Sequence, residues 1–123
     1  MARKKILVVD DSGTARMIEQ MALGRSQYDV VQAKDGAEAV KMAKKELPDL
    51  ILMDVMMPQM DGYEACRTIR AQEETKSIPV IMVTTRGEPV NVETGYRNGC
   101  NDYVTKPVNT LELLAKVKSL IGE

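Results

Sequence analysis

Residues 50–54 read Leu-Ile-Leu-Met-Asp, four apolar side chains followed by an aspartate. The run follows Pro48, which ends the helical pattern before it. A short apolar run bounded by turn signals is typical of a strand that is buried on both faces. Such strands belong to parallel sheets that helices cover on both sides. The stretch therefore favours an α/β fold and places one carboxylate, Asp54, at a strand end.

The same alternation of apolar runs and helical patterns extends over the whole chain. Four further strands are predicted at residues 5–10, 28–33, 78–83 and 102–105, and a helical pattern follows each strand. After the first strand, Met17, Ile18 and Met21 recur at helical spacing. The helix at about residues 89–98 is rich in weak helix formers, so we expect it to be the least stable element. The chain is thus predicted to be a strand–helix unit repeated five times in one doubly wound sheet.

Composition excludes several classes of protein. The 123 residues are 44% apolar and fit one domain, and 17 basic against 18 acidic residues give no basic footprint for nucleic acid. No apolar run is long enough for a membrane span or a signal peptide, which predicts a cytoplasmic protein with no membrane partner. Cys66 and Cys100 lie far apart and the chain has no His, so a zinc site is not expected.

Polar side chains stand at the carboxyl ends of the predicted strands, where ligands bind in such sheets. They are Asp10 and Asp11, Asp54, Thr84 and Thr85, and Lys106 before Pro107. Three close carboxylates repel one another and call for a cation, and hard oxygen donors suit Mg²⁺. A carboxylate can also act as a nucleophile and form an aspartyl-phosphate. Mg²⁺ and the lysine would then neutralise the phosphoryl charge.

Each of these residues also has an ordinary structural explanation. An Asp after a strand is usually a helix cap, a Thr at a strand end reflects β-propensity, and a Lys before Pro is usually a solvated loop residue. These explanations fit each residue taken alone. They do not explain well why polar side chains of these types stand at four strand ends of the same chain.

These motifs together resemble the receiver domain of bacterial two-component response regulators, of the stand-alone, chemotaxis-regulator-like kind. The resemblance rests on VVDDS at residues 8–12, LMDVMMPQMDG at 52–62, MVTT at 82–85 and YVTKP at 103–107, and it extends from Ile6 to Ile121. It implies a flavodoxin-like (βα)5 fold whose five-stranded parallel sheet has the order 2-1-3-4-5. It also implies a single receiver domain over residues 1–123 without an output domain, acting in signal transduction and, by this likeness, in chemotaxis and motility.

The resemblance implies a role for each residue of the acidic site. Asp54 would be the phosphoacceptor, receiving phosphate from a sensor histidine kinase. Asp11, Asp54 and the backbone carbonyl of Met56 would ligate Mg²⁺, and Asp10 would hold a metal-bound water. Lys106 would pair with Asp54 and later with the phosphoryl group.

It also implies a switch and an output surface. Thr84 would move toward the phosphate and Tyr103 would turn inward behind it, and the Lys106–Pro107 bond would be cis. A downstream protein would bind the face formed by the helix at about residues 89–98, the strand at 102–105 and the last helix. We expect a monomer.

Two other functions compete with this one. A phosphorylation-independent interaction module could use the same fold, although such modules usually lose an acid, the Thr or the Lys, and none is lost here. A dehalogenase-type phosphohydrolase would need an acid two residues after its nucleophile, where this chain has Met56, which cannot transfer a proton. We therefore expect no enzyme in the ordinary sense, only a protein that promotes its own Mg²⁺-dependent phosphotransfer and autodephosphorylation.

Overall fold

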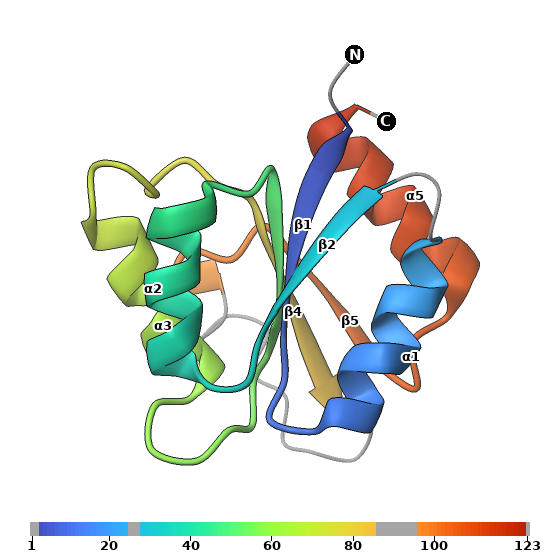
Figure 1. Ribbon diagram of the computed structural model, residues 1–123, viewed down its shortest axis with the longest axis horizontal. Helices are drawn as coiled ribbons and strands as arrows, with labels where there is room; N and C mark the ends of the chain where they lie inside the picture. The colour runs from blue at the N-terminus through green and yellow to red at the C-terminus, as the bar shows by residue number, and fades with distance from the viewer. Residues whose placement is uncertain (1–2, 25–27, 86–95, 123) are drawn as a thin grey trace.

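The computed structural model describes residues 3–24, 28–85 and 96–122. Within these ranges the chain forms one sheet covered on both faces by helices (Figure 1). The helix expected at about residues 89–98 lies largely outside the described residues.

The sheet has five parallel strands in the order β2-β1-β3-β4-β5, which confirms the predicted fold and strand order. Its strands are β1 (Lys4–Val9), β2 (Tyr28–Ala33), β3 (Leu50–Asp54), β4 (Val80–Thr85) and β5 (Asp102–Lys106). Every residue of β3 is buried, as expected for a central strand with helices on both faces. The carboxyl ends of β1 and β3 lie side by side, with Val9 opposite Met53.

Four helices are described, and they divide between the two faces of the sheet. They are α1 (Gly13–Leu23), α2 (Gly36–Glu46), α3 (Gly62–Ala71) and α5 (Thr110–Ile121). Figure 1 shows α2 and α3 on one side and α1 and α5 on the other. Each pair encloses its own apolar core against the sheet. No helix in the described ranges combines the length and apolarity that crossing a bilayer requires.

Each described helix begins with a side chain that caps its first turn. Ser12, Asp35, Asp61 and Asn109 each accept a hydrogen bond from the backbone N–H three residues later. These residue types satisfy N–H groups that the helix itself leaves without partners. Because the helices start at the carboxyl edge of the sheet, the caps also fix the turns that carry the candidate site.

Two predicted strand boundaries differ from the structure in a way that matters for the site. The strand expected at residues 78–83 begins at Val80, because Pro79 has no N–H to give to the sheet and contributes only its carbonyl, to Ile51. That strand continues through Thr85, and the last strand continues through Lys106, with these two residues opposite each other. The sheet therefore includes Thr84, Thr85 and Lys106, whereas the sequence predicted that they lie just after the strands.

Arg70 at the end of α3 ties together segments at the opposite, amino edge of the sheet. Its guanidinium donates to the carbonyl of Ile78 at 2.6 Å, to the carbonyl of Gly99 at 3.0 Å and to Oδ1 of Asn101 at 2.7 Å. Gly99 has φ of 98°, and a Cβ there would lie 2.7 Å from the Arg70 side chain. One side chain thus joins α3, the segment before β4 and the segment before β5.

Gly62 is required where α3 passes close to the end of β3. A Cβ at this position would overlap the backbone carbonyl oxygen of Asp54, and the Gly62 N–H donates to the Val55 carbonyl at 2.9 Å. We expect Gly62→Ala to lower the free energy of unfolding by about 1–3 kcal/mol, because backbone cannot move aside as a side chain can. Denaturant unfolding curves measure the change.

The matched control is Gly13→Ala, where the nearest atom to the new Cβ is the end of the Arg16 side chain at 3.5 Å, an ordinary contact. This variant should be as stable as the wild type or slightly more stable, since Ala favours a helix. Equal effects of the two substitutions would contradict the steric argument.

Candidate functional site

Three carboxylates meet at the carboxyl edge of the sheet. Asp10 follows β1, Asp11 begins the turn to α1 and Asp54 ends β3. One carboxylate oxygen of each lies within 4.8 Å of those of the other two. Asp10 is 1% exposed and Asp54 is 3% exposed, whereas Asp11 faces solvent. The structure therefore brings together the three acids that the sequence singled out.

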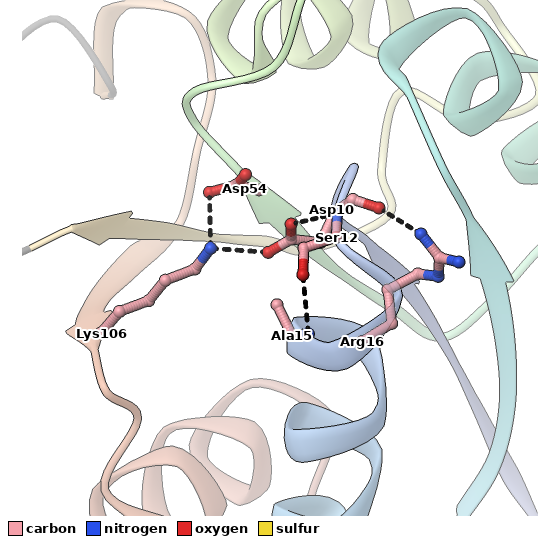
Figure 2. A network of polar contacts seen from close by, with 6 residues as sticks. All are labelled: Asp10, Ser12, Ala15, Arg16, Asp54 and Lys106. Carbon is pink, nitrogen blue, oxygen red and sulfur yellow. Dashed lines mark hydrogen bonds and ion pairs between the residues drawn. The ribbon is translucent and has the colours of Figure 1, made fainter.

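Lys106 is the cation of this cluster. Its Nζ lies 2.7 Å from Oδ2 of Asp10 and 3.3 Å from Oδ1 of Asp54. Figure 2 draws both contacts as dashed lines. The ion pairs of Lys106 are with two of the three carboxylates, so its single charge offsets the acidic cluster only in part. Buried charge that is only partly compensated is costly, so the cluster attracts a further cation.

Burial and the neighbouring charges shift the pKa values of Asp54 and Lys106. Burial raises the pKa of Asp54 to about 6, the charge of Asp10 adds to this, and Lys106 opposes it. Burial by itself would lower the pKa of Lys106, but its hydrogen bond to Asp10 and the charge of Asp54 outweigh burial and raise it. The three carboxylates offer the hard oxygen donors that a divalent cation such as Mg²⁺ prefers.

The turn between β1 and α1 holds Asp10 from two sides. The Ser12 N–H donates to Oδ1 of Asp10 at 2.9 Å, while the Ser12 hydroxyl caps α1 by accepting from the Ala15 N–H (Figure 2). Arg16 donates through Nη1 to the carbonyl of Asp10 at 2.7 Å and through Nε to Gln32 at 2.9 Å. Both the carboxylate and the backbone of Asp10 are therefore fixed.

The sequence prediction missed Arg16, although its position carried a signal. Side chains of a helix lean toward its amino end, so a long basic side chain one turn after the Ser12 cap reaches back to the strand end.

The two candidate switch residues lie on neighbouring strands. Thr84 is 2% exposed, and its Oγ1 has no hydrogen-bond partner among the described residues. Tyr103 lies opposite Met82, two positions before Thr84 along β4, and packs against the core beneath α2 and α3. Lys116 of α5 lies 5.1 Å from the centre of the Tyr103 ring.

Two further predicted features have a place in the structure. Met56 lies two residues after β3 and is 60% exposed, and the role of its backbone carbonyl as a metal ligand stays a prediction. The Lys106–Pro107 bond is cis.

The face of α1 differs from the one used to predict that helix. Met17, Ile18 and Met21, whose helical spacing indicated α1, are 61%, 52% and 61% exposed. The buried face instead includes Glu19 and Leu23, and Glu19 is 2% exposed. The sequence prediction did not single out Glu19. Its signal was a charged residue at the spacing of the buried apolar positions.

The comparison with known families agrees with this geometry. Residues 6–118 match the sequence model of the response regulator receiver domain. The chain belongs to this receiver family. Its fold is close to that of Vibrio cholerae chemotaxis protein CheY4, with a TM-score of 0.88 and 35% identity over 97% of this chain and 99% of that one.

A second solved receiver bears on the metal. The receiver domain of a sensor histidine kinase from Pseudomonas aeruginosa PAO1 matches with a TM-score of 0.89 and 35% identity, covering 99% of this chain and 100% of that one. That structure has a magnesium ion coordinated in its active-site cleft.

Curated relatives are longer than this chain. The alkaline phosphatase synthesis transcriptional regulatory protein PhoP of Bacillus subtilis is 44% identical over 118 residues, which are 96% of this chain and 48% of that protein. ResD, a transcriptional regulatory protein of the same species, is 43% identical over 95% of this chain and 48% of its own length. The receiver domain thus spans about half the length of the curated relatives it matches, so the absence of nucleic-acid binding stays a prediction.

The raised pKa of Asp54 predicts that the metal-free receiver loses stability as the pH rises. The folded carboxyl keeps its proton up to about pH 6, whereas an unfolded Asp ionises near pH 4. The stabilisation from the neutral form is therefore complete below about pH 4 and is lost as the pH rises through about 6. At about pH 7, Asp54→Asn should unfold with a free energy on the order of 1–3 kcal/mol higher than the wild type.

Urea unfolding in EDTA at about pH 4 and pH 7 measures this difference, which should nearly vanish at the lower pH. A stabilisation of equal size at both pH values would show that the charge of Asp54 is not its cause.

Proposed function

We propose that this receiver domain accepts a phosphoryl group on Asp54 in a reaction that requires Mg²⁺, and that the modification changes which partner it binds. The observation that carries the proposal is the position of Asp54, which is almost wholly buried at a strand end beside Asp10, with Lys106 in contact with both. A nucleophilic carboxylate, a metal-binding acid and a fixed cation are the groups that phosphoryl transfer to a carboxylate needs.

The acidic cluster supplies the metal ligands in this proposal. Asp11, Asp54 and the Met56 carbonyl would hold Mg²⁺ directly, and Asp10 would hold it through water. The bound ion supplies positive charge that offsets the charge on the transferring phosphoryl group. The three carboxylates fit this role because their oxygens already lie within 4.8 Å of one another.

The phosphoryl donor in this proposal is a phosphohistidine of a sensor histidine kinase. A carboxylate oxygen of Asp54 forms a bond to phosphorus as the N–P bond of the donor breaks, and the departing imidazole keeps the electron pair of that bond. The ammonium of Lys106, held 3.3 Å from Asp54, then lies beside the new phosphoryl oxygens as a counter-charge. In this proposal the receiver is itself the acceptor of the phosphoryl group, because the group stays on its own Asp54.

Thr84 and Tyr103 would transmit the change. The Thr84 hydroxyl is buried without a partner among the described residues, so an acceptor that arrives on Asp54 gives it a hydrogen bond it now lacks. Movement of Thr84 within β4 would free space that Tyr103 of the adjacent β5 can fill. This is a shift between two packings that a local charge biases.

The output surface in this proposal includes β5 and α5, together with residues 89–98. A stand-alone regulator in the cytoplasm that acts as a monomer, with a role in chemotaxis and motility, remains our prediction for the wider setting. The likeness to the CheY4 chemotaxis protein supports the chemotaxis prediction. The similarity to transcriptional regulatory proteins of twice this length supports a receiver that controls an attached output domain instead.

Phosphorylation of the purified protein tests the proposal directly. With Mg²⁺ and acetyl phosphate, intact-mass spectrometry should find one added phosphoryl group, and with beryllofluoride the amide NMR spectrum should change around β4 and β5. Asp54→Ala should abolish both responses, since it removes the nucleophile. Removal of Mg²⁺ with EDTA should also abolish them.

Asp29→Ala is the matched control, because Asp29 is an exposed carboxylate of β2 that pairs with Arg3. It should respond like the wild type. A wild-type protein that shows no Mg²⁺-dependent response at saturating beryllofluoride would instead favour a phosphorylation-independent interaction module.

Thr84→Ala should separate phosphorylation from its transmission. The acceptor and its cation are intact in this variant, so beryllofluoride should still bind and perturb the amides next to Asp54. The perturbation at Tyr103 should fall to less than about half of the wild-type shift, because the hydroxyl that links the two strands is gone. Thr84→Ser keeps the hydroxyl and should restore the shift. Full-sized shifts at Tyr103 in Thr84→Ala would rule out a role for this hydroxyl.

A further inference from the structure

Lys116 of α5 contacts the candidate switch residue Tyr103 in two ways. Its Nζ donates to the Tyr103 carbonyl at 2.6 Å and lies over the Tyr103 ring, 5.1 Å from the ring centre. An ammonium within about 6 Å of a ring centre is attracted by the electron-rich face of the ring. The Lys116 side chain is 25% exposed, so water screens this attraction less than at a fully exposed pair.

The ammonium of Lys116 is held by oxygens that do not turn with the Tyr103 ring. Besides the Tyr103 carbonyl, it donates to Oδ1 of Asp102 at 3.2 Å and lies 3.7 Å from Oε2 of Glu112, one turn earlier in α5. The same Asp102 oxygen accepts from the Tyr103 N–H at 2.8 Å. Rotation about the Cα–Cβ bond of Tyr103 carries the ring between staggered positions about 120° apart and leaves the backbone carbonyl in place. Such a turn therefore breaks the contact between the ring and the ammonium.

This contact opposes the movement that the proposed switch requires. In that switch Tyr103 turns inward behind Thr84 once Asp54 is modified. The contact with Lys116 stabilises the ring position that the structure shows, in which the Thr84 hydroxyl still has no hydrogen-bond partner among the described residues. A modification that favours the turned ring must overcome this stabilisation, so its apparent affinity falls by the factor by which the contact disfavours the turned state.

We propose that Lys116 is a positioning residue that holds Tyr103 in its resting orientation and thereby sets how readily the receiver switches. The inference rests on the proposed function in one respect, the turn of Tyr103 when Asp54 is modified. Lys116 acts through Tyr103, since the partners of its ammonium in the described chain lie on β5 and α5 and not in the acidic cluster.

The test replaces the ammonium of Lys116 with an uncharged side chain of similar length, in Lys116→Met. The ring ¹H–¹³C NMR signals of Tyr103 are assigned by their loss in Tyr103→Leu. In unmodified Lys116→Met these signals should shift toward the positions that they take in the wild type with saturating Mg²⁺ and beryllofluoride. The apparent dissociation constant for beryllofluoride at saturating Mg²⁺ should fall about two- to fivefold, the range expected from loss of one such ring contact.

Three comparisons separate the ring contact from other effects of the substitution. Lys116→Arg keeps a cation over the ring and should retain the wild-type signals and affinity. Lys118→Met makes the same charge change at an exposed lysine of the same helix and should also leave both unchanged. In a Tyr103→Leu background, Lys116→Met should no longer tighten beryllofluoride binding, because the ring on which the ammonium acts is gone.

Ring signals and affinity that Lys116→Met leaves unchanged, in a wild type that still responds to beryllofluoride, would overturn this inference and leave the proposed function standing. Tighter binding that persists in the Tyr103→Leu background would also overturn it, because Lys116 would then act through the β5 backbone or through its charge alone. A wild-type Tyr103 ring that does not respond to beryllofluoride would contradict the proposed switch itself, and the role of Lys116 would fall with it.

Discussion

The contact between Lys106 and two buried carboxylates is the constraint on which the rest of this receiver depends. Asp10 and Asp54 come from adjacent strands. Without a cation, their negative charges would repel each other, and burying both of them would cost a large desolvation free energy. Lys106 reaches them from β5, across the width of β4, so the order of the sheet is tied to charge balance. Because Lys106 contacts two of the three acids, it offsets part of their charge and leaves the site receptive to a divalent ion.

Most of the fold and of the acidic site was predictable because the information lies in short stretches of the chain. Runs such as residues 50–54 define strands by their own composition, and a parallel sheet then places all strand ends on one edge. Asp10, Asp54 and Lys106 could therefore be grouped without any knowledge of distances. The exact extent of β4 could not be predicted, because it depends on how Pro79 and Thr85 pair with neighbouring strands.

Arg16 and Glu19 were not predicted, and the reasons differ. Arg16 acts through a backbone carbonyl, an acceptor that every residue carries and that a sequence pattern cannot single out. Glu19 was hidden by a wrong choice of helix face, since Met17 and Met21 form an equally regular apolar stripe that the structure leaves exposed. Only the packing of α1 against α5 and the sheet decides which stripe is buried.

The triple anchor formed by Arg70 gives the sheet a fixed end. It joins α3 to the segments that enter β4 and β5 at the edge opposite Asp54, and the close approach of Gly99 leaves that junction little room to slide. In the switch that we propose, a movement that starts at the carboxyl ends of these strands should therefore be smallest at the ends that Arg70 holds. A partner that binds near Asp102 would then meet a nearly constant surface, whereas one that binds near Lys106 would meet the part of β5 that moves in the proposed switch.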